Sequence, residues 1–305
     1  MGRKRRKGQP INGWLVIDKD RGTTSTGVVS AVRRLTRAQK AGHGGTLDPI
    51  ATGVLPIALG EATKTVPYVV EATKAYRFEV RFGEARDTDD AEGVVVATSP
   101  ARPGDGEIEA ALPRFQGAIL QTPPRFAAVK IDGERAYDLA RRGAAVELAP
   151  RPVEIHALAL IARPTADRAV FEMTCGKGAY VRAIARDLGD VLGCHGHVTA
   201  LRRLAVGGFR AEDAVTLATL EQLVEDDALP QALVSLTTAL ADIPALAVTE
   251  PQAQRLRSGQ PIRAARQLVT GDGDADTVRV QLAGEVVALG RFDGDWLAPV
   301  RVFNL

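Results

Sequence analysis

The clearest hydrophobic pattern in the chain is a strict alternation between residues 74 and 83. In this segment, KAYRFEVRFG, aromatic and aliphatic side chains take every second position and charged side chains take most of the positions between them. A period of two is typical of a strand that has one face against a core. Three other apolar segments, 13–19, 153–161 and 169–174, are also expected to form strands.

Two segments show the spacing of an amphipathic helix. One follows Thr24 or Ser25, either of which can cap a helix N-terminus. The other spans 180–192 and precedes Gly193, a residue type that commonly ends helices. The segment 61–70 also looks helical. Strands outnumber helices, and they do not alternate in a βαβ rhythm. We therefore expect an α+β fold with a largely antiparallel sheet.

The chain changes character near residues 242–251. Beyond this point lie three short candidate strands, separated by Gly and Asp turns, at 277–282, 285–290 and 296–300. A small β-rich C-terminal domain is expected there. The predicted organisation is a basic flexible tail at 1–10, a main domain at 11–243 and a C-terminal domain at 244–305.

Basic residues are concentrated near the N-terminus. Residues 1–43 hold 11 Lys and Arg against two Asp, a formal charge of +9, so the rest of the chain carries −7. This asymmetry favours binding of a polyanion near the N-terminal third. The run Arg3–Lys7 equally fits a solvated tail. The basic residues on or next to the first predicted helix are Arg33, Arg34, Arg37 and Lys40.

Composition narrows the class of protein. Apolar residues make up 45% and charged residues 25%, as in ordinary globular domains. No apolar run reaches the roughly 18 residues of a membrane helix, and no signal peptide is recognisable. Two cysteines are too few for a disulfide framework and fit a reducing compartment. A cytoplasmic protein is expected.

Candidate metal sites are weak. The acidic segment 272–276 lacks the glycine and the closing glutamate of a calcium loop. Cys194, His195 and His197, with Cys175 as a distant fourth, match no standard zinc spacing. The acidic segment 87–90 is expected to be a solvated turn. We therefore expect no metal site.

The segment 43–60, HGGTLDPIATGVLPIALG, is the strongest candidate for chemistry. Asp48 precedes Pro49, which favours an extended conformation, and the surrounding glycines allow a ligand to approach the backbone. An Asp-Pro pair in such a loop is most often only a turn. Chemistry would need a cationic partner and a flat binding face, for which Arg182 and Tyr76 are candidates. Taken separately, Arg182 fits a surface charge and Tyr76 a core aromatic.

The segment 42–64, GHGGTLDPIATGVLPIALGEATK, closely resembles the catalytic motif of the bacterial tRNA pseudouridine-55 synthase family, TruB. Other segments resemble further motifs of this family in the same order, at 13–25, 74–93, 121–143, 175–189 and 192–207. The likeness covers nearly the whole chain. It implies the pseudouridine-synthase-like fold, a mixed, largely antiparallel sheet with flanking helices, and a PUA-like RNA-binding domain at 244–305.

The resemblance also implies residue roles. Asp48 corresponds to the nucleophilic aspartate, Arg182 to the arginine paired with it, and Tyr76 to the tyrosine stacked on the flipped uracil. Tyr180 and Leu201 match residues around the target base. His43 matches a residue that pushes into the RNA loop.

The implied reaction is an isomerisation of the T-loop uridine at position 55 of tRNA, with base flipping and no cofactor. The implied partner is the T arm of tRNA, with no guide RNA and no membrane, and a monomer is expected. Sequence leaves open whether Asp48 attacks C6 of the base or C1′ of the ribose, and which group removes the C5 proton. The candidates for contacts to the RNA backbone are Arg33, Arg34, Arg37, Lys130, Arg141 and Arg142.

Two alternatives remain open at this point. One is a non-catalytic tRNA-binding or tRNA-folding protein, against which the combination of Asp48, Tyr76 and Arg182 speaks. The other is a related synthase that acts on ribosomal RNA through a guide, against which the absence of long charged extensions speaks.

The segment 125–150 is too long for a simple connection and is rich in basic residues. We expect it to be a mobile lid that closes on RNA. Several positions depart from the family pattern, which leaves the RNA contacts of this segment open at Phe126 and Ala127. The other departures are Asp20, Gly44, Arg86 and Ala179.

Overall fold

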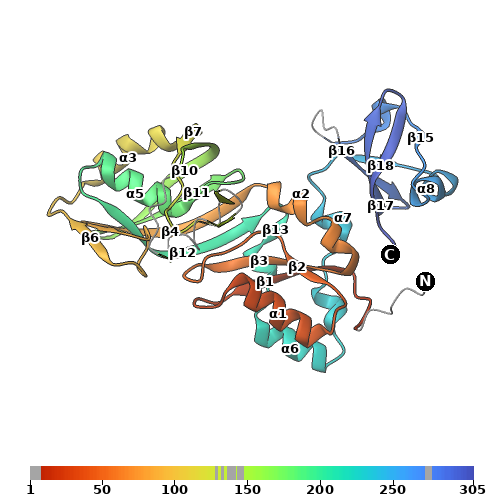
Figure 1. The fold of residues 1–305 in the computed structure, drawn as a ribbon, viewed down its shortest axis with the longest axis horizontal. Coiled ribbons are helices and arrows are strands. Elements are labelled where there is room, and N and C mark those ends of the chain that lie inside the picture. Colours follow the sequence, from red (N-terminus) through yellow and green to blue (C-terminus); the bar gives the residue numbers. More distant parts are fainter. Residues whose placement is uncertain (1–7, 128–129, 132–133, 136–141, 143–147, 272–276) are drawn as a thin grey trace. The chain divides into compact units, whose positions relative to one another are not determined.

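The computed structural model describes residues 8–127, 130–131, 134–135, 142, 148–271 and 277–305 (Figure 1). Its contacts divide the chain into two compact units. The first unit comprises Met1–Pro49, Gly53–Glu71 and Val206–Leu305, and the second comprises Ile50–Thr52 and Ala72–Ala205.

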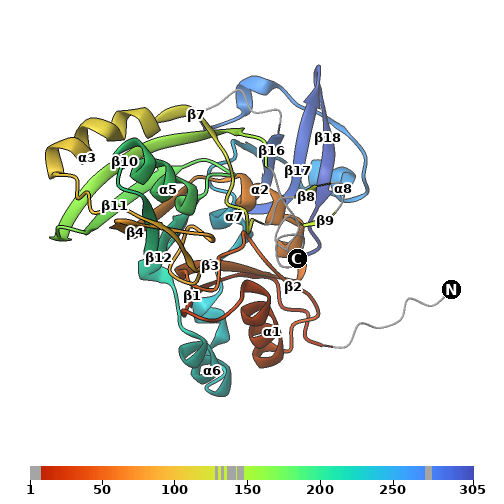
Figure 2. The same ribbon diagram turned by 60° about the vertical axis from the view of Figure 1, so that its left-hand side comes forward.

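The N-terminal part of the first unit is built on three antiparallel strands. β3 (Thr52–Leu59) pairs with β1 (Gly13–Lys19) along its length and with β2 (Ala41–His43) at its end. Helices α1 (Ser25–Thr36) and α6 (Leu217–Glu225) lie side by side in Figures 1 and 2. The expected strand at 13–19 and the expected helix after Thr24 are confirmed.

Shorter helices complete this part of the unit. The segment expected to be helical at 61–70 forms the 3₁₀ helix η1 (Gly60–Lys64) and α2 (Val66–Glu71). The remaining short elements, which all follow residue 206, are β13 (Phe209–Arg210), η3 (Ala211–Asp213), η4 (Leu229–Ala232) and α7 (Leu236–Ala239).

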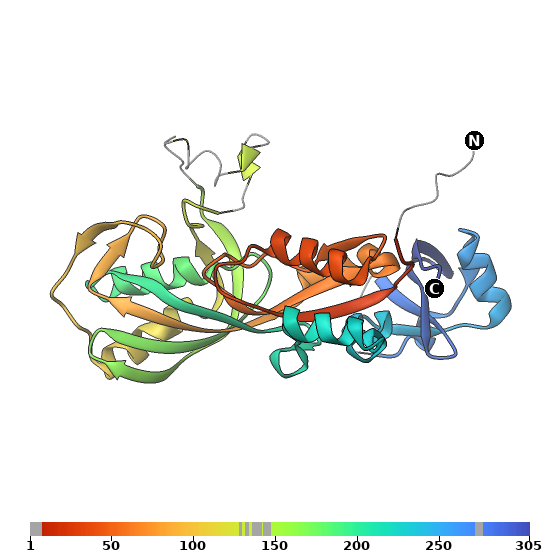
Figure 3. The ribbon, with the colours of Figure 1, turned by 90° about the horizontal axis from the view of Figure 1, so that it is seen from below.

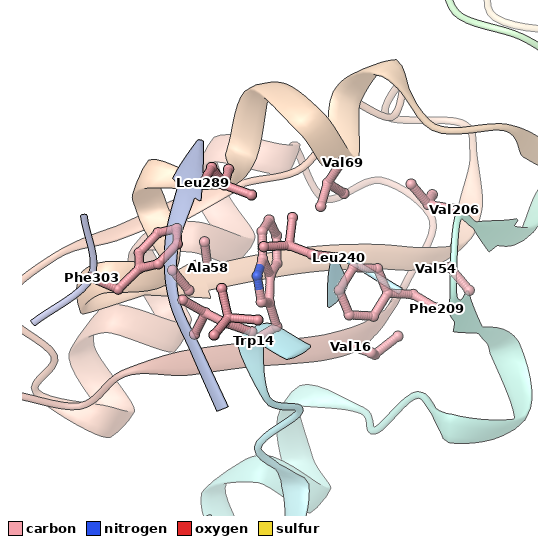
Figure 4. Packing of buried hydrophobic residues seen from close by; sticks show 13 residues of the cluster. Trp14, Val16, Val54, Ala58, Val69, Val206, Phe209, Leu240, Leu289 and Phe303 are labelled. Atoms are coloured by element: carbon pink, nitrogen blue, oxygen red, sulfur yellow. The ribbon is translucent and has the colours of Figure 1, made fainter. Parts of the chain in front are cut away.

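A tryptophan lies at the centre of the core of the first unit (Figure 4). The indole of Trp14 donates a hydrogen bond to Thr65 Oγ1 at 3.2 Å, and its ring centroid lies 5.3 Å from that of Phe209. Residues from the end of the chain, including Leu289 and Phe303, belong to the same buried cluster. The C-terminal strands therefore help to bury the core of the N-terminal strands.

The C-terminal strands form a five-stranded sheet in the order β14-β16-β17-β18-β15. β14 is parallel to β16, and the other pairs are antiparallel. Buried residues of this sheet form a hydrophobic cluster of their own. The domain boundary expected at 243/244 stays a prediction. The expected strands at 277–282, 285–290 and 296–300 are confirmed. The elements are β14 (Ala245–Ala247), α8 (Glu250–Arg257), β15 (Ile262–Arg263), η5 (Arg266–Leu268), β16 (Thr277–Leu282), β17 (Glu285–Asp293) and β18 (Trp296–Val302).

The second unit is organised around strands in the order β12-β4-β11-β10-β7, in which β12 spans Gly196–Val206 and β7 spans Gly117–Gln121. On β4 (Lys74–Phe82), Phe78, Val80 and Phe82 are buried while Arg77 is exposed, which confirms the alternation expected there. β10 (Arg151–Thr165) and β11 (Arg168–Cys175) form a long hairpin, seen in Figures 2 and 3.

The second unit contains further helices and short strands outside this sheet. The helix expected at 180–192 is α5 (Val181–Val191), which is followed by Gly193 at φ 68°. The remaining elements are β5 (Glu84–Arg86), β6 (Val95–Thr98), α3 (Asp105–Ala111), η2 (Leu112–Phe115), β8 (Lys130–Ile131) and β9 (Glu134–Arg135). In the described part of the chain, no helix is long and apolar enough to cross a membrane.

Candidate functional site

The Gly-rich segment that carries Asp48 is anchored on both sides of this residue. The amide of Leu47 donates to Ser25 Oγ at 2.8 Å, and that hydroxyl donates back to the Leu47 carbonyl at 3.0 Å. The carbonyl of Pro49 accepts hydrogen bonds from a backbone amide at 2.8 Å and from Lys19 Nζ at 3.3 Å. Asp48 is half-buried between these anchors. The fold therefore fixes the backbone around a carboxylate that retains access to solvent.

Lys19 is a buried cation that sequence analysis did not single out. It is 1% exposed, and its ammonium also donates to the carbonyl of Asp20 at 2.9 Å. A buried ammonium needs such acceptors, because an uncompensated charge in the interior is costly. Lys19 thus connects the end of β1 to the segment that follows Asp48.

His43 and Gly44 begin the same segment. His43 is half-buried at the end of β2, opposite Ile57 of β3. A Cβ atom at Gly44 would lie 2.7 Å from Val69 Cγ1 and 3.1 Å from the ring of Trp14. These core side chains leave no room for a Cβ atom at position 44 unless they shift.

Tyr76 lies on β4 of the second unit, opposite Met173 of β11. The phenol is hydrogen-bonded to the guanidinium of Arg203, a residue of β12 that is 1% exposed. Burial lowers the pKa of Arg203, and the bond to Tyr76 opposes this shift. Sequence analysis missed Arg203, because nothing local indicates that it turns inward. Leu201 on the same strand is buried, and its carbonyl accepts from Thr52 Oγ1 at 3.4 Å.

Arg182 is not a surface charge. Its side chain is 5% exposed at the start of α5, and its guanidinium donates to the carbonyls of Thr88 and Phe126, each at 3.1 Å. Its Nη1 also lies 3.8 Å from Asp90 Oδ2. Tyr180, two residues before Arg182, is the N-cap of this helix. Arg182 is thus held in the interior by segments distant in sequence.

The expectation of a solvated turn at 87–90 is wrong. Asp89 and Asp90 are 8% and 4% exposed. Asp90 accepts hydrogen bonds from Thr88 Oγ1 at 2.6 Å and from a backbone amide at 3.0 Å. Asp89 Oδ2 lies 3.0 Å from Arg186 Nη1. Arginines of α5 draw both carboxylates inward, and sequence analysis missed them because these partners lie more than 90 positions away.

Burial raises the pKa of Asp89 to about 6, although Arg186 and Arg182 oppose the shift. Its backbone adopts the left-handed conformation, with φ 59°. A non-glycine residue in this region costs free energy and persists where its surroundings hold it. Asp89 therefore combines an unusual backbone conformation with a buried ion pair.

Some of the residues expected to contact an RNA backbone are described by the structure, and the others lie outside the described residues. Arg33 and Arg34 are exposed on α1, and Arg37 is exposed at its C-cap. Arg142 is also exposed. The side chain of Lys130, all of Arg141 and most of the segment 125–150 lie outside the described residues, as do Arg3–Lys7 and the acidic segment 272–276.

The two cysteines are buried, and His195 and His197 each have a partner within the protein. Burial raises the pKa of both Cys175 and Cys194 to about 11, which disfavours the thiolate form that binds metals. His195 Nδ1 lies 3.3 Å from Asp190, and His197 Nδ1 lies 3.1 Å from a backbone carbonyl. Within the described ranges, no cluster of three or more potential metal-binding side chains occurs.

The predicted site residues are divided between the two units. Asp48 and His43 belong to the first unit. Those of the second unit are Tyr76, Tyr180, Arg182 and Leu201.

Comparison with known proteins covers the whole chain. The family profile described as "TruB family pseudouridylate synthase (N terminal domain)" matches residues 33–181, and that of the "tRNA pseudouridylate synthase B C-terminal domain" matches residues 182–241. A relative named tRNA pseudouridine synthase B from Cereibacter sphaeroides is 54% identical over 306 residues, with both chains fully covered. One of the same name from Dinoroseobacter shibae is 55% identical, covering 100% of this chain and 99% of the relative.

Solved structures show a similar fold at low sequence identity. A chain from the crystal structure of a Cbf5-Nop10-Gar1 complex matches with a TM-score of 0.77 and 22% identity, covering 99% of this chain and 92% of that chain. At this identity the likeness supports the pseudouridine-synthase fold alone. The full-length relatives and the two matched profiles show that this chain is a member of the TruB family of pseudouridylate synthases.

Proposed function

We propose that this chain converts the T-loop uridine at position 55 of tRNA to pseudouridine. The observation that carries the proposal is full-length membership of the TruB family, and Asp48 lies in the segment 42–64 that resembles the family's catalytic motif. The relatives at 50–55% identity bear the name tRNA pseudouridine synthase B. This supports tRNA as the substrate over an RNA-guided reaction on ribosomal RNA. The expected place of the reaction is the cytoplasm, with the protein acting as a monomer.

The chemistry is an isomerisation. The N1–C1′ bond breaks, the uracil turns, and a C5–C1′ bond forms while the proton on C5 leaves and N1 gains one. The isomerisation involves no net oxidation or reduction, so it requires no organic cofactor. In this proposal Asp48 supplies the nucleophilic carboxylate. The anchors on Leu47 and Pro49 support this role, because a nucleophile must be held in place to react efficiently.

The substrate base must leave its stack before it can react. Flipping a base costs a few kcal/mol, and stacking on an aromatic ring returns about 1–3 kcal/mol. We assign the stacking role to Tyr76, whose phenol is held by Arg203. Tyr180, Leu201 and His43 are proposed to surround the base and the RNA loop.

The RNA backbone is proposed to follow the exposed basic side chains. Arg33, Arg34 and Arg37 of α1 support this assignment by their exposure. Lys130, Arg141 and Arg142 are proposed contacts from the segment 125–150.

An unmodified tRNA transcript provides the test. Incubation with the purified protein, followed by mapping of pseudouridine at single-nucleotide resolution, should give pseudouridine at position 55. A transcript with cytidine at this position serves as the control and should remain unmodified. If the protein bound the transcript without forming pseudouridine, the non-catalytic tRNA-binding alternative would replace this proposal.

A further inference from the structure

Two arginines one helical turn apart face the same segments of the second unit. Arg182 and Arg186 both lie on α5. Arg186 Nη1 contacts Asp89 Oδ2 at 3.0 Å, and its Nη2 donates to the carbonyl of Thr122 at 2.8 Å. Its Nε donates to Asp187 Oδ1 at 2.8 Å. One guanidinium thus connects α5 to the 88–90 turn and to the segment that follows β7.

Arg182 depends on the same two segments. Its acceptors are the carbonyls of Thr88 and Phe126, and it lies 3.8 Å from Asp90 Oδ2. Thr88 and Asp90 are the neighbours of Asp89 in the chain. A shift of the turn that Arg186 holds would therefore move the groups that orient Arg182.

The turn needs an external restraint. Asp89 combines a left-handed backbone conformation with a buried carboxylate, and both cost free energy. Its amide and carbonyl are bonded to Arg86 and Val198, but Arg186 makes a 3.0 Å ion pair with its carboxylate. Without Arg186, the Asp89 carboxylate would lose this ion pair and the cationic neighbour that most lowers its pKa. Whether the carboxylate then takes up a proton or turns towards water, the turn would lose this connection to α5.

We propose that Arg186 is a positioning residue for pseudouridine formation, which fixes the 88–90 turn and the Thr122 carbonyl against α5 and so holds Arg182 in its orientation. The expected effect on the reaction rate rests on the proposed function. The expected effect on the orientation of Arg182 rests on the geometry of the second unit. Arg186 itself acts through these segments and not on the RNA.

Replacement of Arg186 tests the kinetic consequence. Arg186→Gln should lower the single-turnover rate on tRNA by roughly 10- to 100-fold, the scale expected when catalytic groups lose their alignment, with the Kd for tRNA changed by less than about 3-fold. Arg186→Lys should recover part of the rate, because an ammonium can pair with Asp89 but lacks the planar fork that also reaches Thr122. Arg168→Gln is the matched control, since it removes a 3.0 Å ion pair to Glu79 at the exposed surface of the same unit.

A structural readout separates this inference from the proposed function. In Arg186→Gln, the side-chain NH groups of Arg182 should exchange with solvent faster by NMR, whereas Arg168→Gln should leave them unchanged. This measurement needs no substrate. If the wild type forms no pseudouridine, the proposed function fails and the exchange result still decides the positioning role.

Two results would overturn the inference. One is an Arg186→Gln protein with the wild-type rate and unchanged exchange at Arg182. The other is loss of stability alone, with a normal rate at a temperature where the variant is folded. If Arg186→Gln does not fold, Asp89→Asn and Arg186→Lys provide the same comparison, and wild-type rates in both would equally reject the role.

Discussion

The buried charged side chains near the candidate site each have polar or charged partners of their own. Lys19 is satisfied by two backbone carbonyls, and Arg182 by two carbonyls and a nearby carboxylate. For Asp89, burial outweighs the charged partners, so its pKa is raised to about 6 from the ordinary 3.8. Ionisation of Asp89 therefore costs the folded state free energy at neutral pH.

This shift predicts how stability depends on pH. Because the folded-state pKa of Asp89 is raised, its contribution to stability is fully present below pH 3.8 and is lost as the pH rises through about 6. Between pH 4 and 7, the wild type should lose up to about 3 kcal/mol of unfolding free energy relative to Asp89→Asn, at 1.36 kcal/mol per pKa unit. Urea denaturation across this range measures the difference. If the difference in unfolding free energy did not change with pH, the pKa of Asp89 would not be raised in the folded protein.

At the scale of single elements, local pattern and distant pairing contribute differently. The alternation on β4 and the cap at Thr24 are local features, and both elements formed as predicted. β10 extends over 151–165 instead of 153–161. Its ends pair with β7 and β11, and the sequence of β10 alone does not reveal these partners.

The candidate site divides in the same way. Asp48, Tyr76 and Arg182 could be proposed because the motifs around them resemble a known family. The burial of Arg182, Asp89 and Asp90 could not be predicted from the sequence, because it depends on contacts between α5 and a turn more than 90 positions away. Residue types that are usually exposed gave no local sign of this arrangement.

Helix α1 offers a prediction about RNA binding at the scale of an element. Replacing Arg33 and Arg34 with Gln, and Arg37 with Asn, should weaken tRNA binding and flatten its salt dependence by about 0.7–0.9 in log–log slope for each phosphate that the variant no longer neutralises. Asn suits position 37 because the backbone there is left-handed, with φ 55°. Kd values measured from low to high salt give the slope. Arg114→Gln, at another exposed site, is the control, and an unchanged slope in the triple variant would exclude α1 from the RNA interface.

At the scale of the whole molecule, the C-terminal strands have two roles in packing. They enclose their own cluster, and they also contribute Val286, Leu289 and Phe303 to the core around Trp14. Lys64 Nζ reinforces this contact by donating to the carbonyl of Val302 at 2.8 Å. The segment 244–305 thus contributes to the hydrophobic core of the first unit.

Deletion of residues 244–305 tests this packing. Removing three buried side chains from the Trp14 cluster, at about 1.5–3 kcal/mol each, should lower the thermal midpoint as well as the affinity for tRNA. Phe303→Ala in the full chain should cost about 3–5 kcal/mol and shift the midpoint in the same direction. Thermal melts followed by circular dichroism provide the measurement. A truncated protein that melts like the full chain would instead establish an independent module beginning at 244.

The central claim is that Asp48 performs the chemistry. The most direct measurement is the single-turnover rate of pseudouridine formation at position 55 of tRNA, with wild type and Asp48→Asn compared at saturating protein, alongside the Kd of each for the same tRNA. Loss of a nucleophile should lower the rate by about 10⁴-fold or more, while the Kd changes by no more than a few-fold. An Asp48→Asn protein that retained about a tenth of the wild-type rate would contradict the account, since a loss that small is far below the cost of removing a nucleophile.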